Sequence, residues 1–270
     1  KKHQKIVENI DIGGPTLVRA AAKNYKDVAV ITKIDQYQKL TEELNLFKGS
    51  TSLEFRKKLS QEAFAETASY DLAIFNYFSS FSSEKISKKL FIKANLIQKL
   101  RYGENPHQLG AIYGNDEEFR LKKLHGKELS YNNYNDIFAS LSILKSLPNN
   151  RGTVIVKHTN PSGVSIETNN LKSYLSALNS DPVSAFGGIV ACNYKINLKI
   201  AKEILKSYYE VIIANGFDKK AIKLFKNKKN LRLIDSTKLK LKKINNIVSG
   251  IDSFLMQTND DKIFNKNNFK

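Results

Sequence analysis

Short apolar runs alternate with helical patterns along the second half of the sequence, and this alternation most constrains the fold. Apolar runs bounded by turn residues predict buried strands at 153–158, 187–192, 211–215 and 231–235. Amphipathic patterns predict helices at 135–147, where Asn135 is the expected cap, and at 170–180, 197–210 and 219–229. Strands that alternate with helices in this way predict an α/β domain of three layers.

The first third of the sequence is dominated by helical patterns. A short apolar run at 28–32 predicts one buried strand. Helices are predicted after it at 35–49 and 51–80. Thr51 and Glu54 have the spacing of a capping box at the start of the longer helix. A polar segment follows that helix, and we expect two domains, 1–95 and 96–270.

The chain is strongly basic, with 44 Lys and Arg residues against 26 Asp and Glu and a formal net charge of +18. A basic module that binds nucleic acid is one interpretation. However, Lys outnumbers Arg by 38 to 6, whereas nucleic-acid sites favour Arg forks and aromatic stacking platforms. We therefore favour lysines dispersed over solvated helix faces, which can also attract phosphorylated small substrates.

The sequence also disfavours several classes of protein: membrane-spanning, secreted, disulfide-stabilised and zinc-binding. No apolar run approaches the ~20 residues of a membrane span, and residues 1–14 lack the apolar core of a signal peptide. Cys192 is the only cysteine, which excludes an internal disulfide framework and fits a reducing cytoplasm. One cysteine and four scattered histidines give no zinc-ligand spacing. We expect a cytoplasmic protein with no metal site and with neither nucleic acid nor membrane as a partner.

Polar clusters lie at the ends of predicted elements, where α/β folds usually place ligands. In the first cluster, Gly13 and Gly14 open a helix, Asp11 precedes them, and Lys23 lies toward the far end of that helix. A Gly-Gly turn of this kind is more often structural than ligand-binding. A later cluster holds Gly187 and Gly188 at the start of a strand, where they leave room for a flat ring or a phosphate.

Two further clusters are dense in polar side chains. Residues 101–108 place Arg, Tyr, Glu, Asn and His within eight positions, although a solvated turn would explain them too. Residues 125–136 can equally be a polar loop that ends in a helix cap.

Lys157 and His158 stand side by side where an apolar strand ends. Neighbouring side chains on a strand point to opposite faces, so both can serve one site only if the chain turns there, as Asn160 and Pro161 imply. The adjacent ammonium favours a neutral imidazole, which can accept a proton near pH 7. The ammonium can also stabilise a developing oxyanion. The pair suits attack by a weak nitrogen nucleophile on a carbonyl, and a salt-bridged Lys beside a hydrogen-bonded His explains it equally well.

The motifs become more specific when they are taken together and in order: "IDIGGPTLVRAAAKN", "AFAETASYDLAIFNYF", "LRYGENPHQ", "GKELSYNNYND", "VIVKHTNPSG" and "DPVSAFGGIVA". This series resembles the bifunctional purine-biosynthesis enzymes that combine AICAR formyltransferase with IMP cyclohydrolase. The resemblance implies formyl transfer from the co-substrate 10-formyltetrahydrofolate to AICAR, then ring closure of formyl-AICAR to IMP. It also implies a methylglyoxal-synthase-like part at 1–95 and a zinc-free, cytidine-deaminase-like part at 96–270.

The resemblance also assigns roles by position. His158 would take a proton from the attacking amine, and Lys157 would stabilise the tetrahedral intermediate. Asp11 and Lys23 would serve the cyclohydrolase reaction. The residues expected to bind nucleotide or folate are Arg101, Tyr102, Asn105, His107, Asn160, Gly187, Gly188 and Glu210.

Compared with this family, the sequence lacks the first part of the cyclohydrolase domain and the later half of the transformylase domain. We therefore expect it to be a part of the enzyme. A homodimer is expected, because in this family the transformylase site is built across two subunits. An inert fragment or a basic nucleic-acid-binding module remains the alternative.

Overall fold

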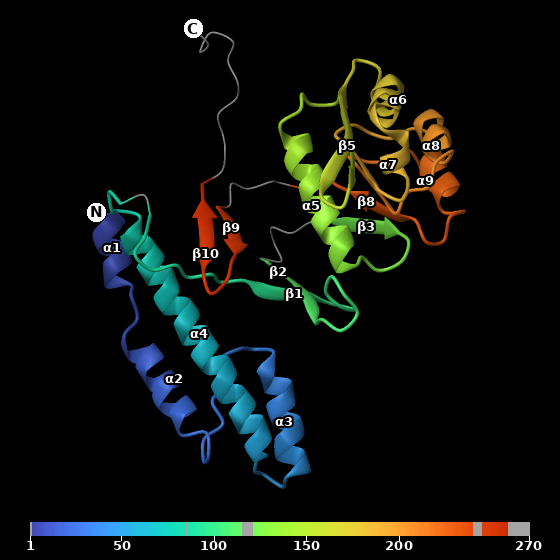
Figure 1. Cartoon of the computed structure of the whole chain (residues 1–270). Coiled ribbons are helices and arrows are strands. Elements are labelled where there is room, and N and C mark those ends of the chain that lie inside the picture. Colours follow the sequence, from blue (N-terminus) through green and yellow to red (C-terminus); the bar gives the residue numbers. More distant parts are fainter. Residues whose placement is uncertain (1, 85, 115–120, 240–244, 259–270) are drawn as a thin grey trace. The chain divides into compact units, whose positions relative to one another are not determined.

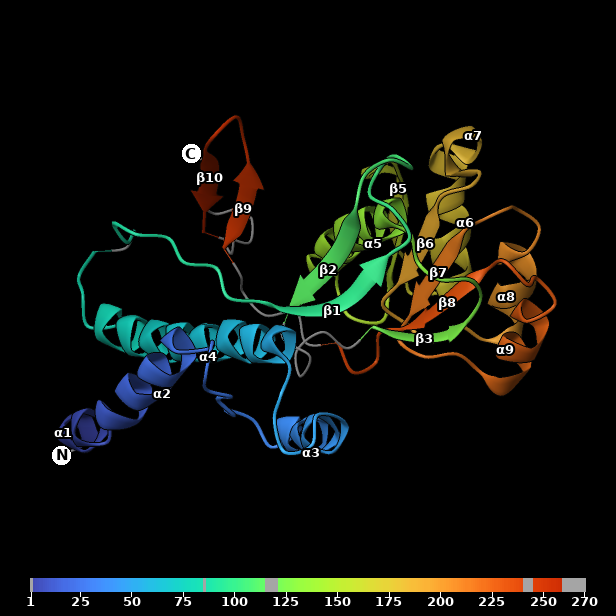
Figure 2. The same ribbon diagram turned by 90° about the horizontal axis from the view of Figure 1, so that it is seen from below.

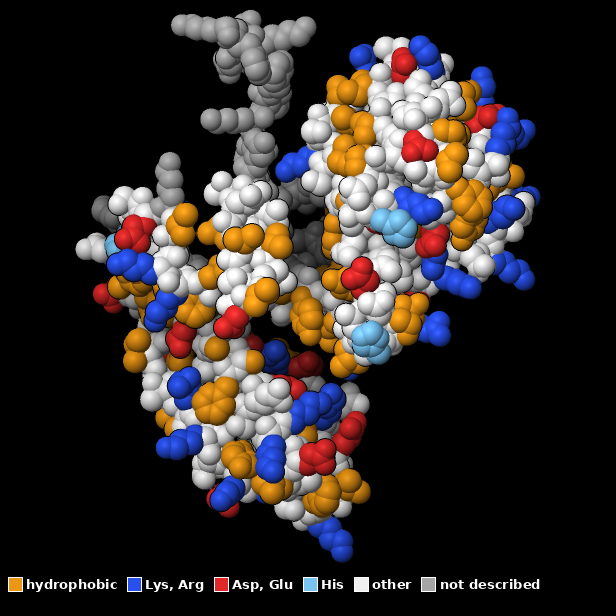
Figure 3. All heavy atoms as spheres, in the orientation of Figure 1, with side chains coloured by type: hydrophobic (Ala, Val, Ile, Leu, Met, Phe, Trp, Pro, Cys, Tyr) orange, Lys and Arg blue, Asp and Glu red, His pale blue; other side chains and the backbone are white. Residues whose placement is uncertain are grey.

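The computed structural model of the 270-residue chain describes residues 2–84, 86–114, 121–239 and 245–258. The chain divides into two compact units, residues 1–93 and 94–270. Each unit is described by itself. Lys and Arg side chains are spread over the visible surface of both units, with Asp and Glu among them (Figure 3).

The first unit is helical. Its elements are α1 (Lys2–Glu8), α2 (Gly13–Lys23), α3 (Gln36–Leu46) and α4 (Leu53–Ser79). Helix α2 packs along α4 (Figure 1), where Ala22, Leu59 and Ala63 form a small core. Helix α4 begins after Ser52, whose hydroxyl accepts a hydrogen bond from the Phe55 amide at 3.2 Å, so the capping box expected at Thr51 and Glu54 is wrong.

The strand predicted at 28–32 is also wrong, because this segment forms no ladder with any described residue. An apolar run becomes a strand only when a neighbouring strand takes its backbone hydrogen bonds. Here Val30 is buried against the helices instead, and the Gln36 side chain accepts from the amides of Thr32 and Lys33.

The second unit is built on a mixed six-stranded sheet with the order β3-β8-β7-β6-β4-β5. Its strands are β3 (Lys122–His125), β4 (Gly152–Lys157), β5 (Asn160–Ile166), β6 (Ile189–Cys192), β7 (Val211–Ala214) and β8 (Arg232–Asp235). Strands β6, β7 and β8 are parallel, whereas β4 runs antiparallel to β6 and β3 antiparallel to β8. The predicted α/β class is confirmed, with a mixed sheet at its centre.

Helices cover both faces of this sheet (Figures 1 and 2). They are α5 (Tyr131–Lys145), α6 (Asn170–Ser180), α7 (Pro182–Ala185), α8 (Leu198–Ile204) and α9 (Lys219–Phe225). Alternate residues of a strand face opposite sides. Accordingly Ile189 and Ala191 pack with Ile137 of α5, whereas Val190 and Cys192 pack with the side chains of α6, α8 and α9. The apolar runs of the sequence are therefore strands covered on both faces.

Two hairpins complete the unit: β1 (Asn95–Leu100) with β2 (Gly110–Gly114), and β9 (Asn246–Ser249) with β10 (Phe254–Gln257). Helix α5 starts four residues earlier than predicted, because Ser130 rather than Asn135 caps it in a reciprocal capping box with Asn133. None of the helices among the described residues is both long and apolar enough to cross a membrane.

Candidate functional site

A cavity of about 610 Å³ opens at one end of the central sheet of the second unit, and we call it the Lys157–His158 cavity. Its walls come from six places in the chain: the segment after β1, the start of α5, the end of β4, and the segments that lead into β6, β7 and β8. The lining residues are Tyr102, Lys127, Ser130, Asn132, Asn133, Asp136, Lys157, His158, Phe186, Gly187, Ile189, Tyr208, Glu210, Asn230 and Arg232.

The cavity lies where the parallel strands begin. Strands β6, β7 and β8 start beside it, while antiparallel β4 delivers its carboxyl end there. The cavity therefore lies at the carboxyl end of β4 and at the amino ends of the three parallel strands. At the opposite end of the sheet, the Asn215 side chain connects the segments that follow the parallel strands. Its Nδ2 donates to the Asn193 carbonyl, and its Oδ1 accepts from the Ser236 hydroxyl.

Lys157 and His158 both line the cavity. Lys157 is the last residue of β4, and its Nζ donates to the Phe186 carbonyl at 2.9 Å. His158 begins the two-residue loop to β5 and has a φ of +51°; Thr159, which follows, has a φ of +63°. These left-handed conformations turn the chain immediately after Lys157. In a continuing strand the side chains of residues 157 and 158 would point to opposite faces of the sheet, but the turn lets both reach the same cavity.

Asn133, Glu210 and Arg232 form a second cluster of polar side chains in the cavity wall, beside the start of α5. The buried Asn133 donates from Nδ2 to Glu210 Oε2 at 2.8 Å, and the Arg232 guanidinium approaches the same oxygen at 3.5 Å. Arg232 also donates to the Glu128 carbonyl. The result is a fixed carboxylate and a fixed cation on the cavity wall, each already oriented by neighbouring groups.

Gly187 and Gly188, which were predicted to bind substrate, have different structural roles. Gly187 lines the cavity and has a φ of +77°, and a Cβ there would meet only the Tyr208 ring, at 3.7 Å. Gly188 is buried, and a Cβ there would lie 2.6 Å from the Val156 carbonyl oxygen. Gly187 therefore leaves space at the cavity, whereas Gly188 allows the backbone to pack closely against β4.

The other predicted binding residues lie at or beyond the cavity rim. Tyr102 lines the cavity, and the Arg101 guanidinium stacks 5.6 Å from the centre of its ring. Asn105 and His107 are exposed in a turn after β1 and are not among the lining residues. Asn160 is also outside the lining set, and its Nδ2 donates to the His158 carbonyl at 2.9 Å.

Asp11 and Lys23 belong to the first unit, where they lie at opposite ends of α2. Asp11 Oδ1 accepts from the Gly14 amide at 2.9 Å, and its own amide meets the Tyr70 hydroxyl at 2.7 Å. The 11 residues of α2 span about 15 Å at 1.5 Å per residue. The described residues of this unit therefore do not bring Asp11 and Lys23 together.

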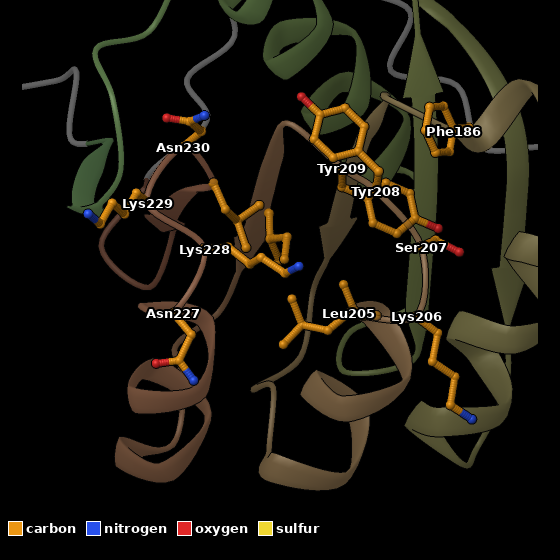
Figure 4. Close-up of a pocket in the computed structure, with 13 residues that line it drawn as sticks. Phe186, Leu205, Lys206, Ser207, Tyr208, Tyr209, Asn227, Lys228, Lys229 and Asn230 are labelled. Carbon is orange, nitrogen blue, oxygen red and sulfur yellow. The ribbon is translucent and has the colours of Figure 1, made fainter.

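A second pocket, of about 530 Å³, borders the Lys157–His158 cavity and shares Phe186, Tyr208 and Asn230 with it (Figure 4). We call it the Tyr208 pocket. The rings of Phe186 and Tyr208 lie 5.3 Å apart, centre to centre. Lys228 extends into the middle of the pocket, whereas Lys206 points away from it. The pocket thus combines aromatic faces with a cation. Across the described ranges of the chain, no three His, Cys, Asp or Glu side chains gather as metal ligands.

Comparison with known proteins identifies the family. A sequence model of the AICARFT/IMPCHase bienzyme matches residues 21–270. The chain belongs to this bienzyme family. The bifunctional purine biosynthesis protein PurH of Thermoanaerobacter sp. (strain X514) is 43% identical over 235 residues, which are 86% of this chain and 46% of that protein. The PurH of Oceanobacillus iheyensis is 38% identical over 266 residues, which are 96% of this chain and 52% of that protein. The chain thus spans about half the length of the curated relatives it matches.

The family assignment confirms the resemblance that the sequence motifs indicated. Sequence reasoning nevertheless missed several residues that line the cavity, among them Lys127, Asn133, Asp136 and Arg232. The first three fall in or beside the polar stretch 125–136, whose density of polar side chains was the available signal. Arg232 carried no signal, because one cation at the start of an apolar strand is common on protein surfaces.

Proposed function

We propose that the second unit is the first part of an AICAR formyltransferase domain and that the first unit is part of an IMP cyclohydrolase domain. The observation that carries the proposal is that Lys157 and His158 face one cavity together with Tyr102, Gly187 and Glu210. The proposed folds, methylglyoxal-synthase-like for 1–95 and cytidine-deaminase-like for 96–270, fit two compact units that divide at 93/94. We also propose a cytoplasmic homodimer.

The chemistry proposed for the pair is a balanced acyl transfer. The 5-amino nitrogen of AICAR attacks the formyl carbon of 10-formyltetrahydrofolate, and His158 takes the N–H proton as the new C–N bond forms. Lys157 donates a hydrogen bond to the formyl oxygen while it carries negative charge. One of its three N–H groups is used by the Phe186 carbonyl, which leaves two for this role. The bond to folate N10 then breaks, and N10 receives the proton from His158.

The folate co-substrate requires an aromatic surface and a cation for its glutamate carboxylate. Phe186, Tyr208 and Lys228 in the Tyr208 pocket supply both beside the Lys157–His158 cavity. For ring closure we propose Asp11 and Lys23 as the residues that handle the carboxamide proton and the departing water.

The test separates the two activities in the bienzyme with both domains complete. His158→Ala should abolish formyl transfer to AICAR while supplied formyl-AICAR still cyclises. Asp11→Ala and Lys23→Ala should give the reverse pattern. His3→Ala is the control for loss of an imidazole, because this ring belongs to the first unit, is not among the residues that line the cavity, and contacts the Tyr77 hydroxyl. Formyl transfer by His158→Ala at the wild-type rate would show that the base is wrongly assigned.

A further inference from the structure

The loop that carries His158 has an unfavourable backbone. It joins β4 to β5 through two residues only, His158 and Thr159, with Lys157 paired to Asn160 on either side. Two-residue hairpin loops with positive φ at both positions favour Asn-Gly, and here they contain His and Thr instead. Histidine is tolerated in the left-handed region better than most residues, whereas a β-branched residue such as Thr159 is an outlier there.

One side chain from outside the hairpin holds this loop. The Thr159 amide donates to Asp136 Oδ1 at 2.6 Å, across 23 residues of sequence. Asp136 lies on α5 next to Ile137, which is fully buried in the core, so the carboxylate is presented by a rigid element. The other bonds of the loop are local: the Thr159 hydroxyl and Asn160 Nδ2 both donate to the His158 carbonyl.

The loop needs this external bond because its conformation sets the direction of the imidazole. Lys157 has its own restraint through the Phe186 carbonyl. His158 is exposed, and among the described residues no group forms a hydrogen bond with its ring, so the direction of the ring depends on the backbone. Asp136 lines the same cavity as His158. We propose that Asp136 is a positioning residue, whose carboxylate fixes the left-handed His158–Thr159 loop and thereby presents His158 to the cavity. Only the catalytic consequence of this proposal rests on the proposed function.

The first test measures the bond itself and needs no activity. Amide hydrogen exchange at Thr159, followed by NMR in this chain, should become at least tenfold faster in Asp136→Ala. Asp136→Asn should stay within about threefold of wild type, because its amide oxygen still accepts from Thr159. Asp235→Ala is the matched control: Asp235 accepts the Thr237 amide in the same way, and its loss should leave Thr159 unchanged. Circular dichroism should show that every variant is folded.

The second test measures the consequence in the complete bienzyme. Asp136→Ala should lower kcat for formyl transfer at least tenfold with less than a threefold change in KM for AICAR, and Asp136→Asn should restore most of it. Adding Thr159→Gly to Asp136→Ala should also recover activity, because glycine accepts the left-handed backbone without the external bond.

The outcomes are distinct. Unchanged Thr159 exchange in Asp136→Ala, or equally fast exchange in the Asn and Ala variants, would overturn the positioning role. Exchange as expected, combined with no formyl transfer even by the wild-type bienzyme, would support the positioning role and overturn the proposed function.

Discussion

Lys157 and His158 are consecutive residues, and both line the same cavity because the backbone of His158 has a φ of +51° directly after the last residue of β4. Had the strand continued through residue 158, the two side chains would have faced opposite sides of the sheet. The chemistry proposed for the pair therefore depends on where the strand stops as much as on the two residue types.

Removing the Glu210 carboxylate should destabilise the second unit. Glu210→Ala leaves the Asn133 amide without its acceptor and the Arg232 side chain, which is 15% exposed, without its ion-pair partner. Unsatisfied buried polar groups cost about 1–3 kcal/mol. Urea unfolding followed by circular dichroism should show a loss of that size. Glu210→Gln should lose less, because its carbonyl still accepts from Asn133; equal losses would show that the Arg232 contact dominates.

The two glycines of the loop before β6 should respond differently to alanine. Gly188→Ala places a Cβ 2.6 Å from the Val156 carbonyl oxygen, so the backbone must shift. We expect a loss of about 1–3 kcal/mol in the free energy of unfolding. Gly187→Ala meets only the Tyr208 ring, at an ordinary contact distance of 3.7 Å, and its cost is that of a left-handed alanine, about 1 kcal/mol. Thermal unfolding of the two variants measures the difference; a larger loss for Gly187→Ala would contradict the packing role of Gly188.

The free energy of unfolding of the second unit should decrease at alkaline pH, in part because the buried Cys192 thiol loses its proton more readily in the unfolded chain. Burial raises the pKa of the Cys192 thiol from its ordinary value of 9.0 to about 11. The folded protein keeps this proton to a higher pH than the unfolded chain, so unfolding releases a proton between pH 9 and 11, and the free energy of unfolding falls as the pH rises. This contribution is fully present below pH 9.

The measurement is urea unfolding at several pH values in that window. The slope of the wild-type free energy of unfolding should be steeper than that of Cys192→Ala by up to about 1.4 kcal/mol per pH unit. Burial also raises the pKa values of Tyr174 and Tyr194. Both tyrosines remain in Cys192→Ala, and burial is the main cause of their raised pKa values, so most of the difference in slope comes from the thiol. Parallel slopes would contradict the burial of the thiol.

Much of the second unit was predictable, because strands buried on both faces leave continuous apolar runs in the sequence. The runs that became β6, β7 and β8 are of this kind. Strand β5 was missed, since its residues, Asn160–Ile166, include Pro161 and Gly163 and lie at the sheet edge. The apolar run at 28–32 was predicted to be a strand and is not one. An apolar pattern indicates that a segment is buried, but it does not indicate whether a partner strand is available.

The site was predictable only in part for a similar reason. The residue types at 157 and 158 suggested the chemistry that is proposed for them, but the sequence does not contain the direction in which β4 crosses the sheet. Asp136 belongs to the polar stretch 125–136, but its role could not be read from the sequence, because its partner, the amide of Thr159, is a backbone group that every residue other than proline has.

The two-residue connection between β4 and β5 also limits how this region can vary in length. A single residue inserted between 157 and 160 would lengthen the turn, release the Thr159 amide from Asp136 and rotate the imidazole away from the ammonium. Longer loops elsewhere on the unit can absorb insertions at low cost. Here the spacing between Asp136 on α5 and the tight turn between β4 and β5 is part of the proposed reactive geometry, so this turn should be the position where added length is tolerated least.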